Sequence, residues 1–193
     1  MDWQVNERCA RRPVLGRYAA DFVILSRPGQ GREWQARLQH WLDRHGLKLN
    51  EEKTRLREVR QAGFKFLGFG ISWRQGKSGR GYPHMEPHPK SQTKRRDKVR
   101  EKLNHWTLWR AADEVIPERN RLLKGWGGYF HQAHSTRVVD RMNQFVVNRV
   151  QRWLWRKGGC ARNLWTTTPQ AVPRERWGLY RLPTWAAWQR ARA

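Results

Sequence analysis

Residues 14–73 alternate between stretches that favour strands and stretches with helical spacing. In Val14–Ser26, β-favouring side chains flank a short centre, Tyr18-Ala19-Ala20-Asp21, and predict a hairpin that turns near Ala19–Ala20. The apolar residues that follow have the spacing of one helix face, and Gly46 can end that helix. These residues are Trp34, Leu38, Trp41 and Leu42. The aromatic and β-branched residues of Phe64–Trp73 favour a strand.

From about residue 91 the pattern becomes helical and very basic. Ser91 is a suitable N-cap for a first helix that carries Val99, Leu103 and Trp106 on one face. A second helix is expected around Val115–Trp126, where three glycines are predicted to break it. These glycines are Gly125, Gly127 and Gly128.

A third helix has the clearest pattern and is expected to begin at a cap near Ser135. Its apolar stripe faces a core, and its opposite face is basic. The stripe consists of Val138, Val139, Met142, Phe145, Val146, Val150, Trp153 and Leu154, and the opposite face carries Arg141, Arg149, Arg152 and Arg156. Short helical pieces are expected in residues 173–188.

These elements together predict an α+β protein. A hairpin and a small antiparallel sheet with a helix occupy residues 1–73, and a small bundle of helices occupies residues 91–193. The intervening residues 74–90 are rich in Gly, Ser and Pro, and they are interpreted as a loop or linker.

The charge of the chain is strongly one-sided. Forty Lys and Arg stand against sixteen Asp and Glu, a formal net charge of +24, and they are interleaved with apolar residues instead of forming a tail. Such a protein attracts a polyanion, with nucleic acid as the first candidate and an acidic membrane surface as the alternative. Thirteen Trp add flat aromatic faces that serve either cores or stacking on bases.

Candidate nucleic-acid contacts follow from these two features. Basic side chains on successive helical turns suit phosphates, and exposed aromatic rings suit base stacking. The candidate phosphate contacts are Lys90, Lys94, Arg95, Arg96, Lys98, Arg100 and Lys102 in one cluster and Arg149, Arg152, Arg156 and Lys157 in another. The candidate stacking residues are Trp109, Tyr129 and Trp155, for each of which packing in the core is an equal alternative.

Other chemistry is poorly supported. Cys9 and Cys160 are the only cysteines, so neither a disulfide framework nor a zinc knuckle is indicated. Two histidine pairs, in His84–His88 and in His131–His134, are interpreted as surface or phosphate-contacting residues instead of metal ligands, and prolines favour a loop for the first. The chain has no apolar run of signal-peptide or membrane-spanning length, which predicts a cytoplasmic protein.

The hairpin centre carries a family resemblance. Tyr18-Ala19-Ala20-Asp21 between β-favouring residues resembles the Tyr-x-Asp-Asp hairpin of reverse transcriptases, and residues 46–54 and 66–69 follow in the order of the late palm of bacterial group II intron reverse transcriptases. Later blocks resemble the maturase region (thumb, domain X) of the same family: residues 89–91, 123–130, 152–157 and 177–182. The resemblance implies a partial palm in 1–73 and an RNA-binding maturase domain in 91–193.

The chain departs from this family at the catalytic hairpin. The leading carboxylate of the pair, which is normally the metal ligand, is Ala20, and only Asp21 remains. The early palm strand with its metal-binding Asp is not recognisable before Val14. Because one carboxylate cannot organise a two-metal site, the chain alone is expected to be catalytically inactive.

The resemblance implies a maturase-like protein that binds a structured group II intron or related ribozyme RNA and assists its folding or splicing. No cofactor is expected in the protein, and Mg²⁺ is expected to serve the bound RNA. A DNA target during intron mobility and a companion reverse-transcriptase chain are further partners, and the location is expected to be bacterial, cytoplasmic, and RNA- or nucleoid-associated.

Two alternatives stay open. One is a split or inactivated reverse transcriptase that takes its fingers and early palm from another chain. The other is a nonspecific basic nucleic-acid-binding remnant.

Overall fold

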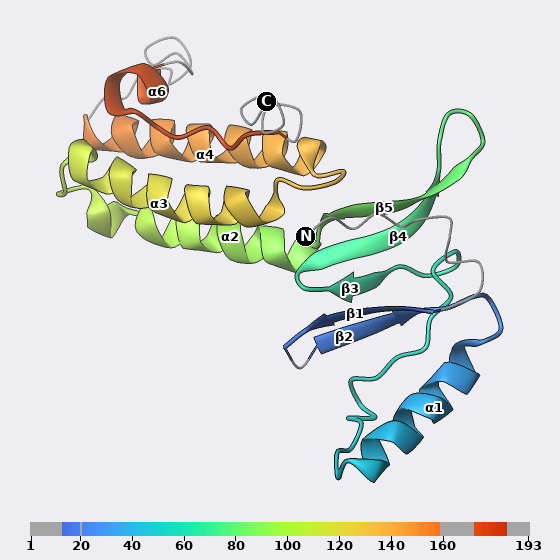
Figure 1. The fold of residues 1–193 in the computed structure, drawn as a ribbon. Coiled ribbons are helices and arrows are strands. Elements are labelled where there is room, and N and C mark those ends of the chain that lie inside the picture. The colour runs from blue at the N-terminus through green and yellow to red at the C-terminus, as the bar shows by residue number, and fades with distance from the viewer. Residues whose placement is uncertain (1–12, 20, 159–171, 185–193) are drawn as a thin grey trace, which may run out of the picture. The chain divides into compact units, whose positions relative to one another are not determined.

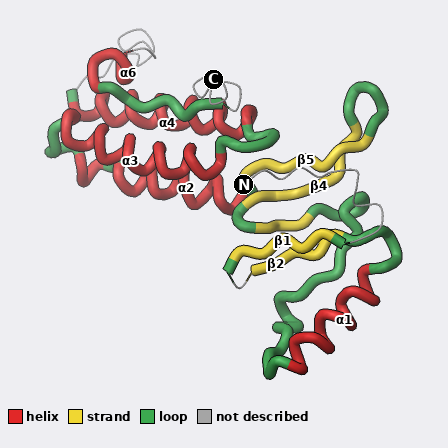
Figure 2. Tube along the Cα trace, viewed as in Figure 1, coloured by secondary structure: helices red, strands yellow, loops and turns green. Residues whose placement is uncertain are grey.

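The computed structural model describes residues 13–19, 21–158 and 172–184, and it divides the chain into two compact units, 1–67 and 68–193 (Figure 1). The chain combines helices with small antiparallel sheets, so the predicted α+β class is confirmed (Figure 2). Among the described residues, every buried hydrophobic side chain belongs to the second unit.

The first unit begins with the predicted hairpin. Strand β1 (Val14–Tyr18) pairs antiparallel with β2 (Asp21–Leu25), and Tyr18 lies opposite Asp21. Ala19 adopts a left-handed backbone conformation with φ 51°, as the first position of a two-residue hairpin turn often requires. The other turn residue, Ala20, lies outside the described residues.

Helix α1 (Gly31–Arg44) confirms the helix predicted from the spacing of Trp34 to Leu42. Gly46, with φ 68°, follows its last turn, and the amides of Gly46 and Leu47 bond back to the carbonyls of Asp43 and Leu42. These two bonds define a Schellman motif, which explains why the helix ends where the glycine predicts.

The strand predicted over Phe64–Trp73 is interrupted. Strand β3 (Phe64–Phe66) ends the first unit, and β4 (Phe69–Gln75) begins the second. Leu67 and Gly68 between them both have positive φ, 47° and 80°, so the backbone turns at this point. A side chain at Gly68 would approach the ring of Phe130 to 3.1 Å, which favours glycine for its size as well.

Residues 74–90 do not form the predicted loop. Strand β5 (Gly81–Pro87) pairs antiparallel with β4 from Phe69↔Pro87 to Gln75↔Gly81, and only a short turn separates the strands. The two prolines of this strand favoured a loop in the sequence-based prediction. Because β5 is an edge strand, their missing N–H groups are tolerated there.

Helices α2, α3, α4 and α6 form the helical part of the second unit (Figure 1). The bounds are α2 Pro89–Lys102, the short 3₁₀ helix η2 His105–Thr107, α3 Ala112–Phe130, α4 Thr136–Lys157 and α6 Val172–Trp177. Their core contains Phe69, Val99, Leu103, Val115, Ile116, Leu123, Trp126, Phe130, Val138, Val139, Met142, Val146, Val147, Val150, Trp153, Leu179 and Leu182.

The ends of two helices differ from the prediction. The N-cap of α2 is His88, whose Nδ1 accepts from the Lys90 amide at 3.2 Å, whereas Ser91 lies inside the first turn and donates to the Gly68 carbonyl at 2.9 Å. Helix α3 also continues through its three glycines instead of breaking there. The helix start predicted near Ser135 is confirmed by α4, although the Ser135 side chain makes no cap hydrogen bond.

An extended segment after α6, residues 178–182, lies against α3 and α4 and is called the strap. Asn120 of α3 donates to the Gly178 carbonyl and accepts from the Tyr180 amide, both at 2.8 Å. Asn143 of α4 donates to the carbonyl of Leu182 at 3.0 Å and accepts from its amide at 2.9 Å. The two asparagines therefore substitute for a strand partner and hold the strap on the bundle.

Candidate nucleic-acid interface

The hairpin that resembles a polymerase motif presents only part of one. Tyr18 and Asp21 face each other across the β1–β2 pair and are both exposed. Among the described residues, no three His, Cys, Asp or Glu side chains gather where they could hold a metal ion. The hairpin therefore offers one exposed carboxylate. The basic residues of the helical bundle are the stronger candidate for a functional surface.

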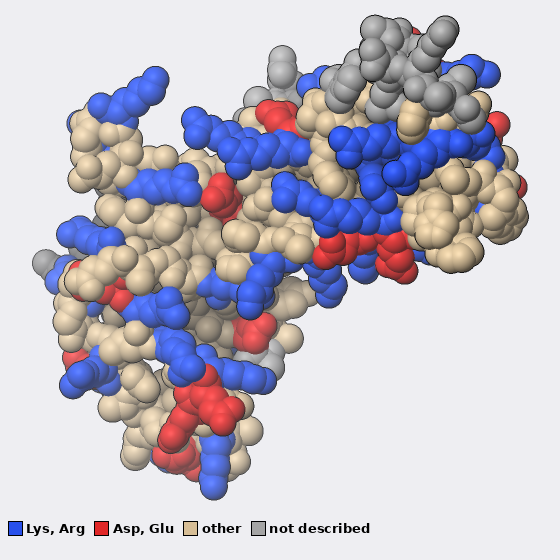
Figure 3. Space-filling model, turned by 180° about the vertical axis from the view of Figure 1, so that it is seen from behind, with Lys and Arg blue, Asp and Glu red and all other residues tan. Residues whose placement is uncertain are grey.

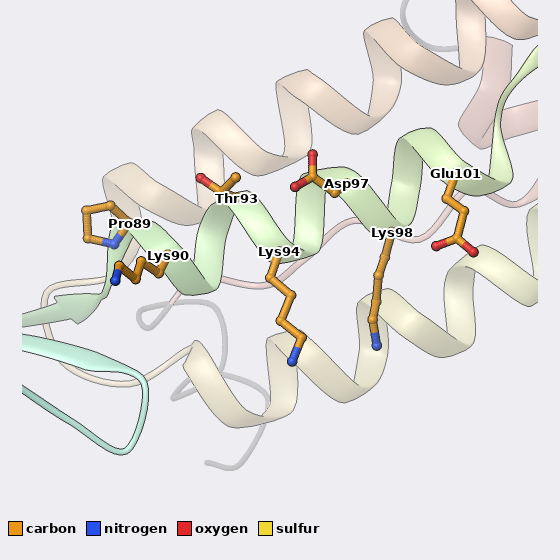
Figure 4. Close-up of a pocket in the computed structure, with 7 residues that line it drawn as sticks. All are labelled: Pro89, Lys90, Thr93, Lys94, Asp97, Lys98 and Glu101. Carbon is orange, nitrogen blue, oxygen red and sulfur yellow. The ribbon is translucent and has the colours of Figure 1, made fainter.

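Helix α2 is the most basic element of the bundle. Its fourteen residues include seven Lys and Arg and two acidic residues, and only Val99 is buried. Lys94 and Lys98, one turn apart, extend from the same side of the helix above a shallow groove, with Glu101 after them and Asp97 on the other side (Figure 4). We call Lys94 and Lys98 the lysine row; it is exposed, and Glu101 lies on the same side of the helix.

The other side of α2 brings arginines together with arginines of α4. The guanidinium carbons of Arg96 and Arg100 lie 5.8 and 5.4 Å from the ring centre of Phe145 on α4, within cation–π distance. Burial lowers the pKa of Arg149, and the positive charges of Arg156, Arg100 and Arg152 lower it further. We call Arg96, Arg100, Arg149, Arg152 and Arg156 the arginine cluster.

The positive charge of this cluster is poorly compensated within the described part of the chain. Arg100 pairs with Asp97 at 2.7 Å, and none of the ion pairs found among the described residues involves the other four arginines. The buried Nε groups of Arg96 and Arg149 also have no acceptor there. Repelling charges and buried donors both favour binding of an anion with several acceptor oxygens, such as phosphate.

Arg95 lies near this surface and is half-buried. Burial lowers the pKa of its guanidinium, and its Nε and one terminal nitrogen have no acceptor among the described residues. Figure 3 shows Lys and Arg side chains covering much of the helical unit on the face that it displays.

Lys157 differs from the other predicted contacts. Its Nζ donates to the carbonyls of Leu108 at 2.8 Å and Arg110 at 2.9 Å. Two of its three donors are therefore occupied in fixing the α2–α3 connection, and the structure gives it a scaffold role. Four other predicted contacts have exposed side chains, as the sequence predicts: Lys90, Lys102, Arg152 and Arg156.

Sequence reasoning missed Arg119 on α3, which is almost fully buried. It donates to the Lys102 carbonyl at the end of α2 at 3.3 Å, and burial lowers its pKa to about 10. Its position between polar neighbours in a helix gives no sign of burial in the sequence. The residue caps α2 from inside the bundle.

The three candidate stacking residues lie in different surroundings. Trp109 is 80% exposed, and Tyr129 is 47% exposed with its ring 4.7 Å from Phe130 and 5.6 Å from Phe69. Trp155 on α4 is half-buried. The sequence also places Trp106 on the apolar face of a helix, which is wrong: α2 ends at Lys102, and Trp106 is 74% exposed in η2.

The histidines interpreted as surface residues are partly buried. His84 lies in β5, 7% exposed, and its ring stacks on His134 with centres 4.6 Å apart. His134 also bonds both the amide and the carbonyl of Met85 and so attaches β5 to the α3–α4 connection. His131 is buried and donates from Nδ1 to the Gly127 carbonyl at 3.1 Å. These histidines serve packing.

The fold and its basic surface define a small helical domain that is suited to binding a polyanion. A comparison with known protein families indicates which family this domain resembles. Residues 92–166 match the family model of the group II intron, maturase-specific domain. No curated protein matches the chain. The match spans the whole arginine cluster and supports the C-terminal maturase domain of a group II intron reverse transcriptase that the resemblance predicts. It does not reach the Tyr18–Asp21 hairpin.

The match also makes group II intron RNA the implied partner of this domain. None of the helices in the described parts of the chain combines the length and the apolar character needed to cross a bilayer.

Proposed function

We propose that this chain binds a structured RNA, a group II intron or related ribozyme, and assists its folding or splicing. The observation that carries the proposal is the arginine cluster of α2 and α4, whose charges have little acidic compensation among the described residues. The maturase-specific family match over residues 92–166 supports an intron RNA as the polyanion.

Phosphate groups suit this cluster for two reasons. A guanidinium presents a planar fork of donors that matches phosphate oxygens, and each bound phosphate reduces the repulsion between neighbouring arginines. Arg96 and Arg100 are also oriented by Phe145, so less conformational freedom is lost on binding. The lysine row of α2 would extend the contact as exposed point charges.

In this proposal the protein contributes binding and the RNA contributes chemistry. Ala20 stands where the family's leading metal-binding carboxylate would be, so we assign Mg²⁺ to the RNA. Binding to the folded form would stabilise the RNA by mass action, as any ligand that prefers one state does.

A second candidate is a split reverse transcriptase, favoured by the hairpin that keeps Tyr18 opposite Asp21. Primer extension with this chain and companion chains that carry fingers and early palm tests it. Extension only after Ala20→Asp would indicate a complete but disabled site, whereas extension by the unchanged chain would contradict the assignment of catalysis to the RNA.

Competition binding tests the leading proposal. The chain is bound to a labelled group II intron RNA and challenged with unlabelled intron RNA or with an unrelated structured RNA of equal length, at one fixed salt concentration. The proposal expects the intron RNA to compete better. Equal competition would favour the nonspecific basic remnant, and a splicing assay with and without the chain then tests the assistance itself.

A further inference from the structure

The connection between α2 and α3 holds two tryptophans that the basic surface alone does not explain. Trp106 is 74% and Trp109 80% exposed, the two most exposed of the large hydrophobic side chains in the described part of the chain. Exposing the apolar surface of two indoles to water costs free energy, and exposed apolar groups of this size commonly mark a binding surface.

The two indoles lie three residues apart in a tightly turned connection. Trp106 belongs to the 3₁₀ helix η2, and the amides of Thr107, Leu108 and Arg110 bond to the carbonyls three residues earlier. Leu108, between the two tryptophans, packs against the core, whereas both indoles remain exposed. We call Trp106 and Trp109 together the tryptophan ridge.

The ridge is held by bonds from α4. The Trp153 indole donates to the Thr107 hydroxyl at 3.0 Å, and the single hydrogen of that hydroxyl is shared between the carbonyls of Asn104 at 3.0 Å and Lys102 at 3.1 Å. Lys157 fixes the carbonyls on both sides of Trp109. A loop fixed in this way has already lost the freedom that binding would otherwise remove.

The surroundings of the ridge favour nucleic acid. The residues of α4 that hold the loop, Trp153 and Lys157, alternate in the last turns of the helix with Arg152 and Arg156 of the arginine cluster. The nearby carboxylates of Glu114 and Glu118 pair with Arg110 at 3.7 and 2.7 Å, and Glu118 also lies 3.9 Å from Arg119, so two arginines offset the two negative charges. A phosphate chain bound by the last arginines of α4 would thus bring its nucleotides close to the indoles.

We propose that the tryptophan ridge stacks on unpaired nucleobases of the RNA that the arginine cluster binds, and so selects RNA with single-stranded loops or bulges over continuous duplex. This inference rests on the proposed RNA binding and adds a base contact to it. Stacking on aromatic side chains tolerates any base, so the ridge recognises unpaired bases without reading their sequence.

The test compares two stem-loop RNAs with the same phosphates. One has ordinary nucleotides in its loop, and the other has abasic nucleotides there. The unchanged chain is expected to bind the ordinary loop about tenfold more tightly, from the usual loss of affinity on removing one stacking partner. The double variant Trp106→Ala/Trp109→Ala is expected to bind both RNAs with the lower affinity.

Two control variants sharpen the comparison. Trp106→Phe/Trp109→Phe keeps aromatic faces and should retain part of the preference. Trp41→Ala removes another exposed tryptophan, 53% exposed on α1 of the other unit, and should retain all of the preference. Circular dichroism spectra of the variants check that they fold, which is expected because the ridge lies outside the core.

The outcomes separate this inference from RNA binding itself. If the unchanged chain binds neither RNA, the proposed function fails. If it binds both equally, or if the double alanine variant keeps the preference, RNA binding stands and the ridge has another partner, such as a protein.

Discussion

Asn143 is expected to be one of the most sensitive polar residues of the helical unit. Its side chain, 7% exposed on α4, makes two hydrogen bonds to the backbone of Leu182, and Leu182 is itself 1% exposed. Asn143→Ala removes both partners at once. The amide and the carbonyl of Leu182 would then be buried without a hydrogen bond unless water enters or the strap leaves the bundle.

The magnitude follows from these two groups. An unsatisfied buried donor or acceptor costs about 1–3 kcal/mol, so two of them are expected to lower the free energy of unfolding by about 2–6 kcal/mol. Release of the strap limits the loss, because freed backbone groups bond to water. Release, however, also exposes the Leu182 side chain, which costs about 2 kcal/mol of buried apolar surface.

Two measurements check this expectation. Urea denaturation followed by circular dichroism gives the free energy of unfolding, and amide hydrogen exchange reports the Leu182 amide directly. Asn148→Ala, also on α4, is the matched control, because within the described part of the chain Asn148 accepts a single exposed bond, from Gln144 at 3.0 Å. A loss in Asn143→Ala no larger than in the control, with the Leu182 amide still protected, would show that Asn143 does not hold the strap on the bundle.

Two further predictions concern α3 and β5. Gly127→Ala should destabilise the helical unit, because the new Cβ would lie 2.7 Å from Cδ2 of Leu182. A Cβ at Gly128 would meet open space, so Gly128→Ala should stabilise α3 by up to about 1 kcal/mol. Equal urea midpoints for the two variants would contradict the close packing of the strap. Burial, and then the charges of His84 and Arg74, lower the pKa of His134 from 6.5 despite the opposing Glu86 carboxylate. The unfolded chain therefore takes up a proton that the folded chain resists, and stability should fall as the pH drops below 6.5. His134→Asn should reduce this dependence of the urea midpoint, and an unchanged dependence would show that another group causes it.

Elements with a strong local pattern could be predicted from the sequence. The hairpin around Ala19–Ala20, helix α1 with its glycine end, and α4 all have apolar spacing or turn chemistry that acts over a few residues. Local rules suffice there because each element already contains the residues that define its ends.

Elements that depend on distant contacts could not be predicted. Strand β5 forms because it pairs with β4, and this pairing outweighs its two prolines and Gly81. The glycines of α3 read as helix breakers, yet Gly127 is required for its small size because Leu182 of the strap packs against it. His88 replaces Ser91 as the cap of α2 since the Ser91 hydroxyl is engaged by the carbonyl of Gly68.

The sequence predicted which basic residues belong to the candidate interface, but not which of them lie close together in space. Charge spacing identified the residues of α2 and α4, whereas the approach of Arg100 to Arg149, and of Arg96 and Arg100 to Phe145, depends on how the two helices pack. The sequence also could not separate Lys157, which fixes a loop, from its exposed neighbour Arg156. Individual roles require the fold, because side chains of one type differ only in what they contact.

The salt dependence of RNA binding tests whether the arginines of α2 and α4 bind phosphates. The logarithm of the binding constant is measured against the logarithm of salt concentration for the unchanged chain and for Arg149→Gln/Arg152→Gln/Arg156→Gln, with Arg37→Gln on α1 as an exposed control. If about six phosphates are neutralised, the slope of the unchanged chain is near −4, from roughly −0.7 per phosphate of a single strand. The triple variant should bind more weakly with a slope shallower by about 2, and the control should keep the original slope. A slope near zero for the unchanged chain, or the same slope for the triple variant, would contradict an RNA interface built on the arginines of α2 and α4.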